Sequence, residues 1–324
     1  MRRFGNLYGN ICKEENIYLA YEKARKGKAK TPGVVAFERN LQKNLNSIRE
    51  ELVSQTYRTS PYETFFIHDP KEREIYRLPF RDRVVHHAVM NVLESIWVPV
   101  FISQTYSCVK GKGIHGALKT LSRDLKDTQG TQYCLKMDIR KYYPSVDHEV
   151  LKSIVRKKIK DKRLLHLLDG IIDSAPGIPI GNYLSQFFAN LYLSYFDHWL
   201  KEERQVKYYY RYADDMVMLS SSKHELRVLL DDVKRYLSEK LKLQVKNNWQ
   251  IFPVSSRGID FVGYVFYHDH IRMRKSIKKN FCRKAYKLRR KNLAGKDFKC
   301  ALSSWMGWAK HCNSRNLIKK IMES

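Results

Sequence analysis

The sequence lacks several features that would place it in common protein classes. No uninterrupted apolar run approaches the ~20 residues that a membrane-spanning helix needs, so we do not expect a spanning protein. The first residues, Met1 to Asn6, contain no apolar stretch of the kind found in signal peptides. The six cysteines include no Cys-x-x-Cys pair. Neither a zinc ribbon nor a disulfide framework is therefore predicted, and we expect reduced thiols and a cytoplasmic protein.

Acidic residues are also scarce relative to basic ones. The 324 residues contain 33 Asp and Glu against 61 Lys and Arg, a net charge of +28. This excess is larger than solubility requires and predicts a polyanionic partner, nucleic acid before an anionic membrane. The segment from His268 to Ser324 has 17 Lys and Arg against 3 Asp and Glu. Its spaced apolar residues predict a small helical bundle with a basic face, which we expect to bind a duplex backbone rather than to be only a solvated surface.

One acidic dipeptide stands between two runs that are typical of strands. Tyr208–Tyr212 is rich in aromatic residues and Met216–Leu219 is apolar, with Asp214 and Asp215 between them. This pattern predicts a hairpin with two carboxylates at its tip. Adjacent negative charges need compensation, which divalent cations such as Mg²⁺ provide. Taken alone, the dipeptide is equally compatible with an ordinary hairpin turn.

A third carboxylate follows another predicted strand. The stretch from Tyr133 ends at Asp138, and a turn with two tyrosines and a proline comes next. Asp138 beside the hairpin would complete a three-carboxylate set. Two metal ions roughly 3.5–4 Å apart need such a set to activate a hydroxyl and to stabilise a pyrophosphate leaving group. In isolation, Asp138 also fits the role of a cap or surface turn residue. The Gly-rich stretch from Gly111 to Gly116 is not a P-loop, because it lacks the Gly-Lys-Ser/Thr ending.

The remaining segments predict an alternation of helices and short strands. Helices are expected over 1–60, from Arg81 to about Trp97, over 150–172, after the Gly/Pro-rich stretch 176–182, and over 226–241; strands are expected at 65–68, 74–78 and 258–266. The basic loop 25–33 is either a phosphate contact or a solvated connector. The predicted hairpin at 65–78 carries Lys71 and Arg73 at its tip and Arg77 on its second strand. These three residues can clamp a nucleotide triphosphate, although most such tips are simply charged and exposed.

These residues, in this order, resemble a reverse transcriptase. The resemblance implies an α+β right-hand polymerase fold in three parts. These are N-terminal helices and fingers at 1–130, a palm of antiparallel sheet plus helices at 131–267 with a helical insertion at about 150–175, and a basic helical thumb at 268–324. It also implies RNA-directed DNA polymerase activity with two Mg²⁺ ions, for which Mn²⁺ can substitute. The implied partners are template RNA, the RNA–DNA duplex with its cDNA, and dNTPs.

The resemblance assigns roles to individual residues. Tyr212-Ala213-Asp214-Asp215 resembles the polymerase box, Asp138 resembles the first metal-binding aspartate, and Ile139 is counted with the metal site. Tyr143 matches the aromatic steric gate that screens the sugar 2′ position, and Lys71 and Arg73 match the nucleotide-contacting pair of the fingers. Gly258–Tyr264 resembles the primer grip, and Lys246 is a looser match to a basic residue near the pyrophosphate.

One loop indicates a subtype. Ile180-Gly181-Asn182-Tyr183-Leu184-Ser185-Gln186 is similar to the reverse transcriptases of diversity-generating retroelements, as are the compact size and the absence of maturase, endonuclease or RNase H appendages. This likeness implies a bacterial or phage-encoded enzyme for mutagenic retrohoming, with errors at template adenines and a small basic accessory protein, single or oligomeric. Ile180 and Arg73 would line the nascent base pair, and Gln186 would touch the base pair or template. The alternatives are a phage-defence reverse transcriptase that uses its own noncoding RNA and a silent RNA-binding scaffold.

Overall fold

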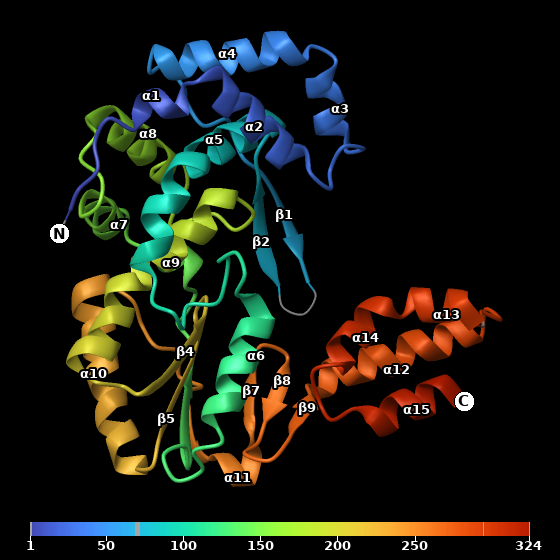
Figure 1. The fold of residues 1–324 in the computed structure, drawn as a ribbon. Coiled ribbons are helices and arrows are strands. Elements are labelled where there is room, and N and C mark those ends of the chain that lie inside the picture. Colours follow the sequence, from blue (N-terminus) through green and yellow to red (C-terminus); the bar gives the residue numbers. More distant parts are fainter. Residues whose placement is uncertain (1, 69–71, 294, 324) are drawn as a thin grey trace. The chain divides into compact units, whose positions relative to one another are not determined.

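The computed structural model describes residues 2–68, 72–293 and 295–323 (Figure 1). Its contacts divide the chain into two compact units. The first unit contains residues 1–109, 139–205 and 234–245, and the second contains 110–138, 206–233 and 246–324. Each unit is assembled from segments that are distant in the sequence. The division into fingers, palm and thumb stays a prediction.

The first unit is mainly helical. Its helices and short helical turns are α1 (Tyr8–Ile11), α2 (Glu14–Arg25), α3 (Pro32–Glu38), α4 (Leu41–Val53), α5 (Phe80–Trp97), η1 (Val98–Val100), η2 (Tyr143–Ser145), α7 (His148–Arg156), α8 (Lys162–Ile172), α9 (Tyr183–His198) and η3 (Trp199–Glu203). The helices expected over 1–60 and up to Trp97 are confirmed. Helix α5 packs against both α2 and α9. The acidic first turn and basic last turn of α2 also match the helix dipole.

One expected helical stretch is in fact two helices. The sequence predicted continuous helix over 150–172, but α7 ends at Arg156 and α8 begins at Lys162. Asp161 caps α8 by accepting a hydrogen bond from the backbone N–H of Leu164 (3.3 Å), which gives the chain a local reason to restart a helix there. Asp147 caps α7 in the same way through the N–H of Val150 (3.0 Å).

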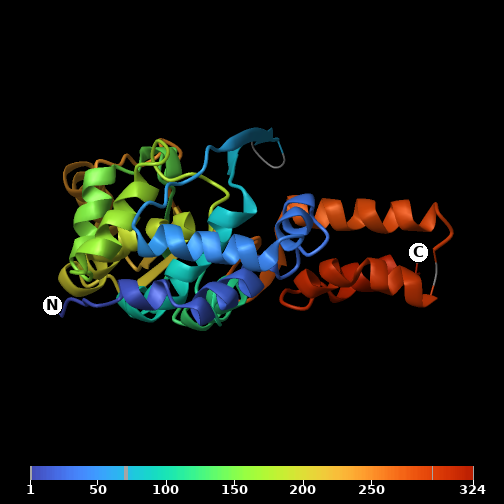
Figure 2. The ribbon, with the colours of Figure 1, turned by 90° about the horizontal axis from the view of Figure 1, so that it is seen from above.

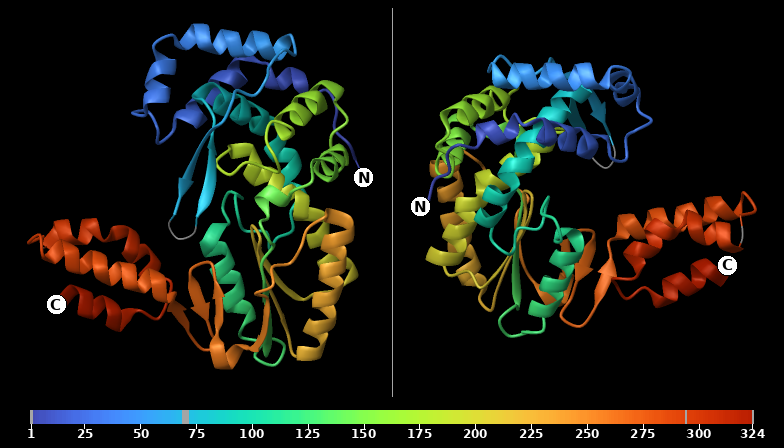
Figure 3. Two further views of the ribbon diagram at one scale, coloured as in Figure 1. Left: turned by 180° about the vertical axis from the view of Figure 1, so that it is seen from behind. Right: turned by 45° about the horizontal axis from the view of Figure 1, so that its top comes forward.

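The predicted hairpin of the first unit is present. Strands β1 (Glu63–Ile67) and β2 (Arg73–Arg77) form an antiparallel hairpin (Figure 3). In its register, Ile67 is opposite Arg73. Arg73 therefore begins the second strand instead of lying on the tip. Lys71 lies outside the described residues.

The second unit contains a four-stranded antiparallel sheet in the order β4-β5-β3-β6. Its strands are β3 (Tyr133–Met137), β4 (Tyr208–Tyr212), β5 (Asp215–Ser220) and β6 (Gln250–Pro253). The two central strands supply buried residues such as Leu135 and Met218, which pair across the sheet. Helix α6 (Gly113–Asp124) packs on β4. Helix α10 (Lys223–Leu241) begins in this unit and ends in the first.

The rest of the second unit is a small sheet followed by basic helices. Strands β7 (Ile259–Phe261), β8 (Tyr264–Phe266) and β9 (Ile271–Met273) follow the short helix α11 (Val254–Arg257); the C-terminal helices are α12 (Lys275–Arg289), α13 (Gly295–Ala301), α14 (Ser303–Ala309) and α15 (Arg315–Glu323). These helices run side by side in orange and red in Figure 2 and enclose their own core around Phe281 and Leu302, as the sequence predicted. No helix within the described ranges is both long and apolar enough to cross a membrane.

Candidate active site

The acidic dipeptide lies at the tip of the β4–β5 hairpin. Tyr212 pairs with Asp215, so only Ala213 and Asp214 form the loop. Ala213 has a φ of 55°, the left-handed conformation that two-residue hairpin loops use to match the twist of their strands. Strand β3 pairs with β5 and ends with Met137 opposite Met216. Since the two strands are antiparallel, the next residue, Asp138, arrives at the edge of the sheet that carries the hairpin tip.

Asp138 and Asp214 are brought together at this edge. The pKa of Asp214 is raised from the ordinary 3.8 to about 7, first by burial and then by the charge of Asp138 and a hydrogen bond between the two carboxyl groups. Two carboxyl groups close enough to share a hydrogen bond resist simultaneous ionisation unless a cation lies between them. Their oxygen atoms are the donors that Mg²⁺ prefers, so this pair fits a divalent cation.

Asp215 has a different environment. Its Oδ1 lies 3.0 Å from Nζ of Lys136, which also donates a hydrogen bond to the backbone oxygen of Asp260. Burial raises the pKa of Asp215, and the neighbouring Lys136 opposes that rise. The predicted three-carboxylate set thus appears as a close pair plus one ion-paired carboxylate. Across the described ranges, no three His, Cys, Asp or Glu side chains are grouped so as to hold a metal ion.

Lys136 was missed by the sequence reasoning, although a signal was available. It stands two residues before Asp138, and alternate residues of a strand face the same side of a sheet. A lysine at that position in an otherwise apolar strand therefore faces the carboxylates.

Lys246, predicted near the pyrophosphate, contacts Asp138. Its backbone N–H donates to the Asp138 carbonyl oxygen (2.8 Å), and its Nζ lies 4.0 Å from Oδ2 of the same residue. Its side chain is 42% exposed, so the ammonium group remains accessible to a second anion. Ile139, counted with the metal site, is a buried residue with an apolar side chain. Only its backbone oxygen can serve as a cation ligand.

A cavity of about 250 Å³ opens beside Asp138 within the second unit. It is lined by Lys136, Met137, Asp138, Asn248, Gln250, Phe252, Arg257, Gly258 and Asp260. The predicted primer grip thus shares this wall with Asp138. Gly258 has a φ of 72°, and an added Cβ there would lie 2.7 Å from the ring of Tyr267, so the bend requires glycine.

The other predicted nucleotide-binding residues belong to the first unit. Arg73 is exposed at the start of β2, and Arg77 is exposed at its end, where it pairs with Glu63 (2.5 Å). The carbonyl oxygen of Tyr143 accepts from the N–H of Ile178 (2.9 Å), and that of Ile180 accepts from the N–H of Tyr76 (2.8 Å).

Gln186, the last of the predicted nucleotide-binding residues, is exposed on α9, and its Oε1 accepts from the Cys108 thiol (3.1 Å). The structure therefore attaches Ile180 to the β1–β2 hairpin and leaves Gln186 accessible to solvent. The roles of all these residues stay predictions.

A family model described as "Reverse transcriptase (RNA-dependent DNA polymerase)" matches residues 68–266, more than half of the chain. The chain belongs to the reverse transcriptase family. The matched range contains β3, the β4–β5 hairpin and the cavity beside Asp138, so the close pair of carboxylates lies within the polymerase domain of this reverse transcriptase.

Individual proteins are similar to this chain in sequence or in fold. Protein YkfC of Escherichia coli (strain K12) is 26% identical over 288 residues, covering 73% of this chain and 76% of YkfC. Group II intron-encoded protein LtrA of Lactococcus lactis subsp. cremoris is 23% identical over 352 residues, covering 84% of this chain but only 57% of LtrA. The apo telomerase of Candida tropicalis truncated from its C-terminal domain has a TM-score of 0.51 at 15% identity, covering 70% of this chain and 59% of the telomerase chain. The predicted α+β reverse transcriptase fold is confirmed.

Proposed function

We propose that this reverse transcriptase copies a retroelement RNA into cDNA, with Asp138 and Asp214 as its metal-binding carboxylates. The close Asp138–Asp214 pair carries the proposal, because its mutual repulsion makes it a ready site for divalent cations. When bound, two Mg²⁺ ions, or Mn²⁺ in their place, supply Lewis-acid activation and neutralise the charge of the leaving group. Asp215 supports the site from its ion pair with Lys136.

The remaining residues act by positioning and charge. The 3′-hydroxyl of the primer attacks the α-phosphate of a dNTP and pyrophosphate leaves, a reaction in which orientation and electrostatic stabilisation account for most of the rate. Lys246 is placed to meet a negatively charged group near Asp138. Arg73, Arg77 and Lys71 steady the triphosphate, and Tyr143 screens the sugar. Replacing Tyr143 by alanine should raise ribonucleotide incorporation relative to dNTPs by about tenfold.

We further propose that the enzyme belongs to a diversity-generating retroelement and makes errors at template adenines. The motif Ile180–Gln186 supports this subtype, and the structure shows a reason for its glycine. Gly181 has a φ of 120°, and a Cβ there would lie 2.6 Å from the carbonyl oxygen of Tyr76. The motif is therefore held tightly against β2. The proposed partners are template RNA, the RNA–DNA duplex and a small basic accessory protein.

Two experiments test these proposals. For catalysis, Asp214→Asn should reduce nucleotide incorporation on the order of 100-fold or more, whereas Asp297→Asn, a matched change on exposed α13, should not. Unchanged incorporation by Asp214→Asn with metal present would refute the site. For the subtype, the protein is co-expressed with its flanking locus and the bound cDNA is sequenced. Substitutions concentrated opposite template adenines support the retroelement role. Faithful, repetitive or untemplated cDNA favours the phage-defence alternative.

A further inference from the structure

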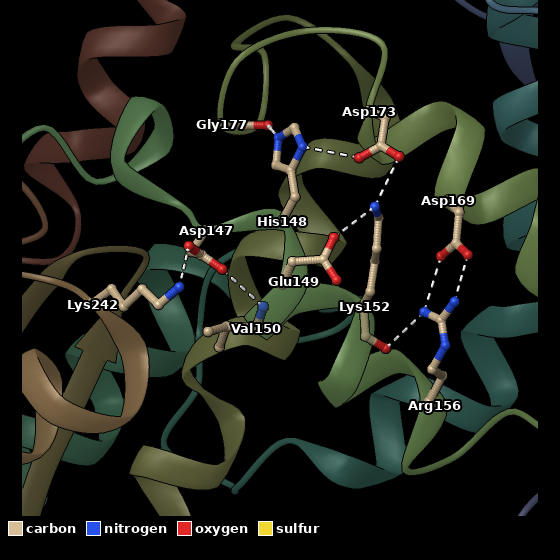
Figure 4. A network of polar contacts seen from close by, with 10 residues as sticks. All are labelled: Asp147, His148, Glu149, Val150, Lys152, Arg156, Asp169, Asp173, Gly177 and Lys242. Carbon is tan, nitrogen blue, oxygen red and sulfur yellow. Dashed lines mark hydrogen bonds and ion pairs between the residues drawn. The ribbon is translucent and has the colours of Figure 1, made fainter.

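His148 joins two parts of the first unit that the proposed mechanism does not otherwise connect. It is the first residue of α7, and its Nδ1 lies 3.0 Å from Oδ1 of Asp173 (Figure 4). Its Nε2 lies 2.8 Å from the carbonyl oxygen of Gly177. Asp173 directly follows α8, and Gly177 lies in the Gly/Pro-rich stretch that leads to Ile180. The ring is thus held on both sides, with 24% of the side chain exposed.

Both partners of this imidazole are hydrogen-bond acceptors. A carbonyl oxygen cannot donate, so Nε2 must carry a proton. Nδ1 faces Oδ1 of Asp173, whose other oxygen lies 2.8 Å from Nζ of Lys152. The geometry therefore holds the ring between the residue that follows α8 and the loop that leads to Ile180.

The charged groups around His148 come from three places. They are Asp147, Glu149 and Lys152 at the start of α7, Asp173 at the end of α8, and Lys242 after α10. Of these groups, the structure places only Asp173 in direct contact with the ring. Asp147 is engaged by Lys242 (2.7 Å) and by the N–H of Val150.

The loop that His148 holds is packed against the proposed steric gate. Ile178 donates its N–H to the carbonyl oxygen of Tyr143 (2.9 Å). Gly177 has a φ of 59°, and a Cβ there would lie 2.4 Å from that same oxygen. Only a glycine lets the loop approach so closely, and the bond from His148 keeps its carbonyl in place. Two residues further on, the carbonyl oxygen of Ile180 is bonded to Tyr76.

We propose that His148 is a positioning residue whose ring clamps the loop 174–182 onto Tyr143 and so sets the geometry of the nucleotide site. The idea rests on the proposed function for the roles of Tyr143 and Ile180, but the clamp itself does not. The ring contacts Asp173 through one nitrogen and the Gly177 carbonyl oxygen through the other, so a side chain without both nitrogens leaves at least one end of the clamp open.

Nucleotide kinetics test the positioning role. The KM and kcat for dNTP incorporation are measured for the wild type, His148→Ala, His148→Gln and the control His166→Ala, an exposed histidine on α8. We expect His148→Ala to raise the KM about three- to tenfold, the size expected for one hydrogen bond, with little change in kcat. His148→Gln keeps one hydrogen-bond donor and should recover part of the loss. The control should behave as the wild type. An unchanged KM in His148→Ala would overturn the proposal.

Hydrogen exchange tests the clamp without any activity. Exchange of the peptide 174–182 at one fixed pH should be faster in His148→Ala than in the wild type, and the control His166→Ala should leave it unchanged. Should the protein show no polymerase activity, the proposed function fails and this measurement alone decides the clamp. Equal exchange in the wild type and His148→Ala would contradict it.

Discussion

The close carboxylate pair makes a prediction about stability that is independent of catalysis. In metal-free protein, Asp214 has a pKa raised from 3.8 to about 7, because burial and Asp138 both oppose its ionisation. In the unfolded chain its pKa returns to the ordinary value. A raised folded-state pKa means that the folded form binds the extra proton. The associated stability is complete below about pH 4 and is lost as the pH rises toward 7. Asp214→Asn cannot ionise and avoids this loss.

The magnitude follows from linkage. The difference between 3.8 and about 7 corresponds to roughly 4 kcal/mol at full strength. Because Asp214 is only half-buried, solvent screens part of this energy, and we expect ~1–2 kcal/mol. In EDTA, Asp214→Asn should therefore be more stable than the wild type by ~1–2 kcal/mol at pH 8 and equal to it near pH 4.

Urea denaturation in EDTA at several pH values measures this difference. Asp297→Asn on exposed α13 is the matched control and should follow the wild type. Adding Mg²⁺ should reverse the order at pH 8, because the cation stabilises the ionised pair and the asparagine variant has lost one ligand. If Asp214→Asn were no more stable than the wild type at pH 8 in EDTA, the two carboxyl groups would not repel one another in solution.

Three further substitutions probe the supporting structure by thermal or urea denaturation. Lys136→Met should lower the free energy of unfolding by ~1–3 kcal/mol, because it leaves Asp215 without its charge partner. The double variant Lys136→Met with Asp215→Asn should recover most of this stability. A double variant no more stable than Lys136→Met would argue against the ion pair. Asp161→Ala should lower the free energy of unfolding by ~1–3 kcal/mol at pH 7, since the carboxylate accepts three backbone N–H bonds. Burial raises the pKa of Asp161, but these hydrogen bonds lower it by more, so the pKa lies below its ordinary value. The effect of the substitution should therefore shrink as the pH falls below 4. Gly181→Ala should cost ~1–3 kcal/mol because its added Cβ would meet a carbonyl oxygen, whereas Gly170→Ala, which meets nothing within 4 Å, should be neutral or stabilising.

The failures of the sequence-based predictions are as informative as the successes. The break between α7 and α8 was missed because the Lys- and Arg-rich stretch 156–163 keeps a helical character, and the new start at Lys162 depends on the single N-cap Asp161. Arg73 was predicted to lie on the hairpin tip because the tip was expected to be longer; the second strand in fact begins at that residue. Both errors concern element boundaries, which one side chain or one pairing decides.

Local pattern was sufficient for the elements that carry the site. The β-forming residues of Tyr208–Leu219 and Tyr133–Met137 predict strands, and the sequence places carboxylates directly at the ends of those strands. Both predictions depend only on residues that are neighbours in the sequence. The family resemblance likewise rests on short motifs in a fixed order. Fold class and the identity of Asp138, Asp214 and Asp215 as candidates therefore required no coordinates.

Only the tertiary structure decided how these groups divide their roles. The pairing of β3 with β5 brings Asp138 close to Asp214, while Lys136 forms an ion pair with Asp215. The spacing of the three aspartates in the sequence does not show which two form the close pair and which one is ion-paired. The hydrogen bonds of His148 likewise depend on two partners contributed by distant segments. The physical reason is the same in both cases. A side chain's secondary structure follows from its neighbours in sequence, whereas its charge, pKa and hydrogen-bond partners follow from its neighbours in space.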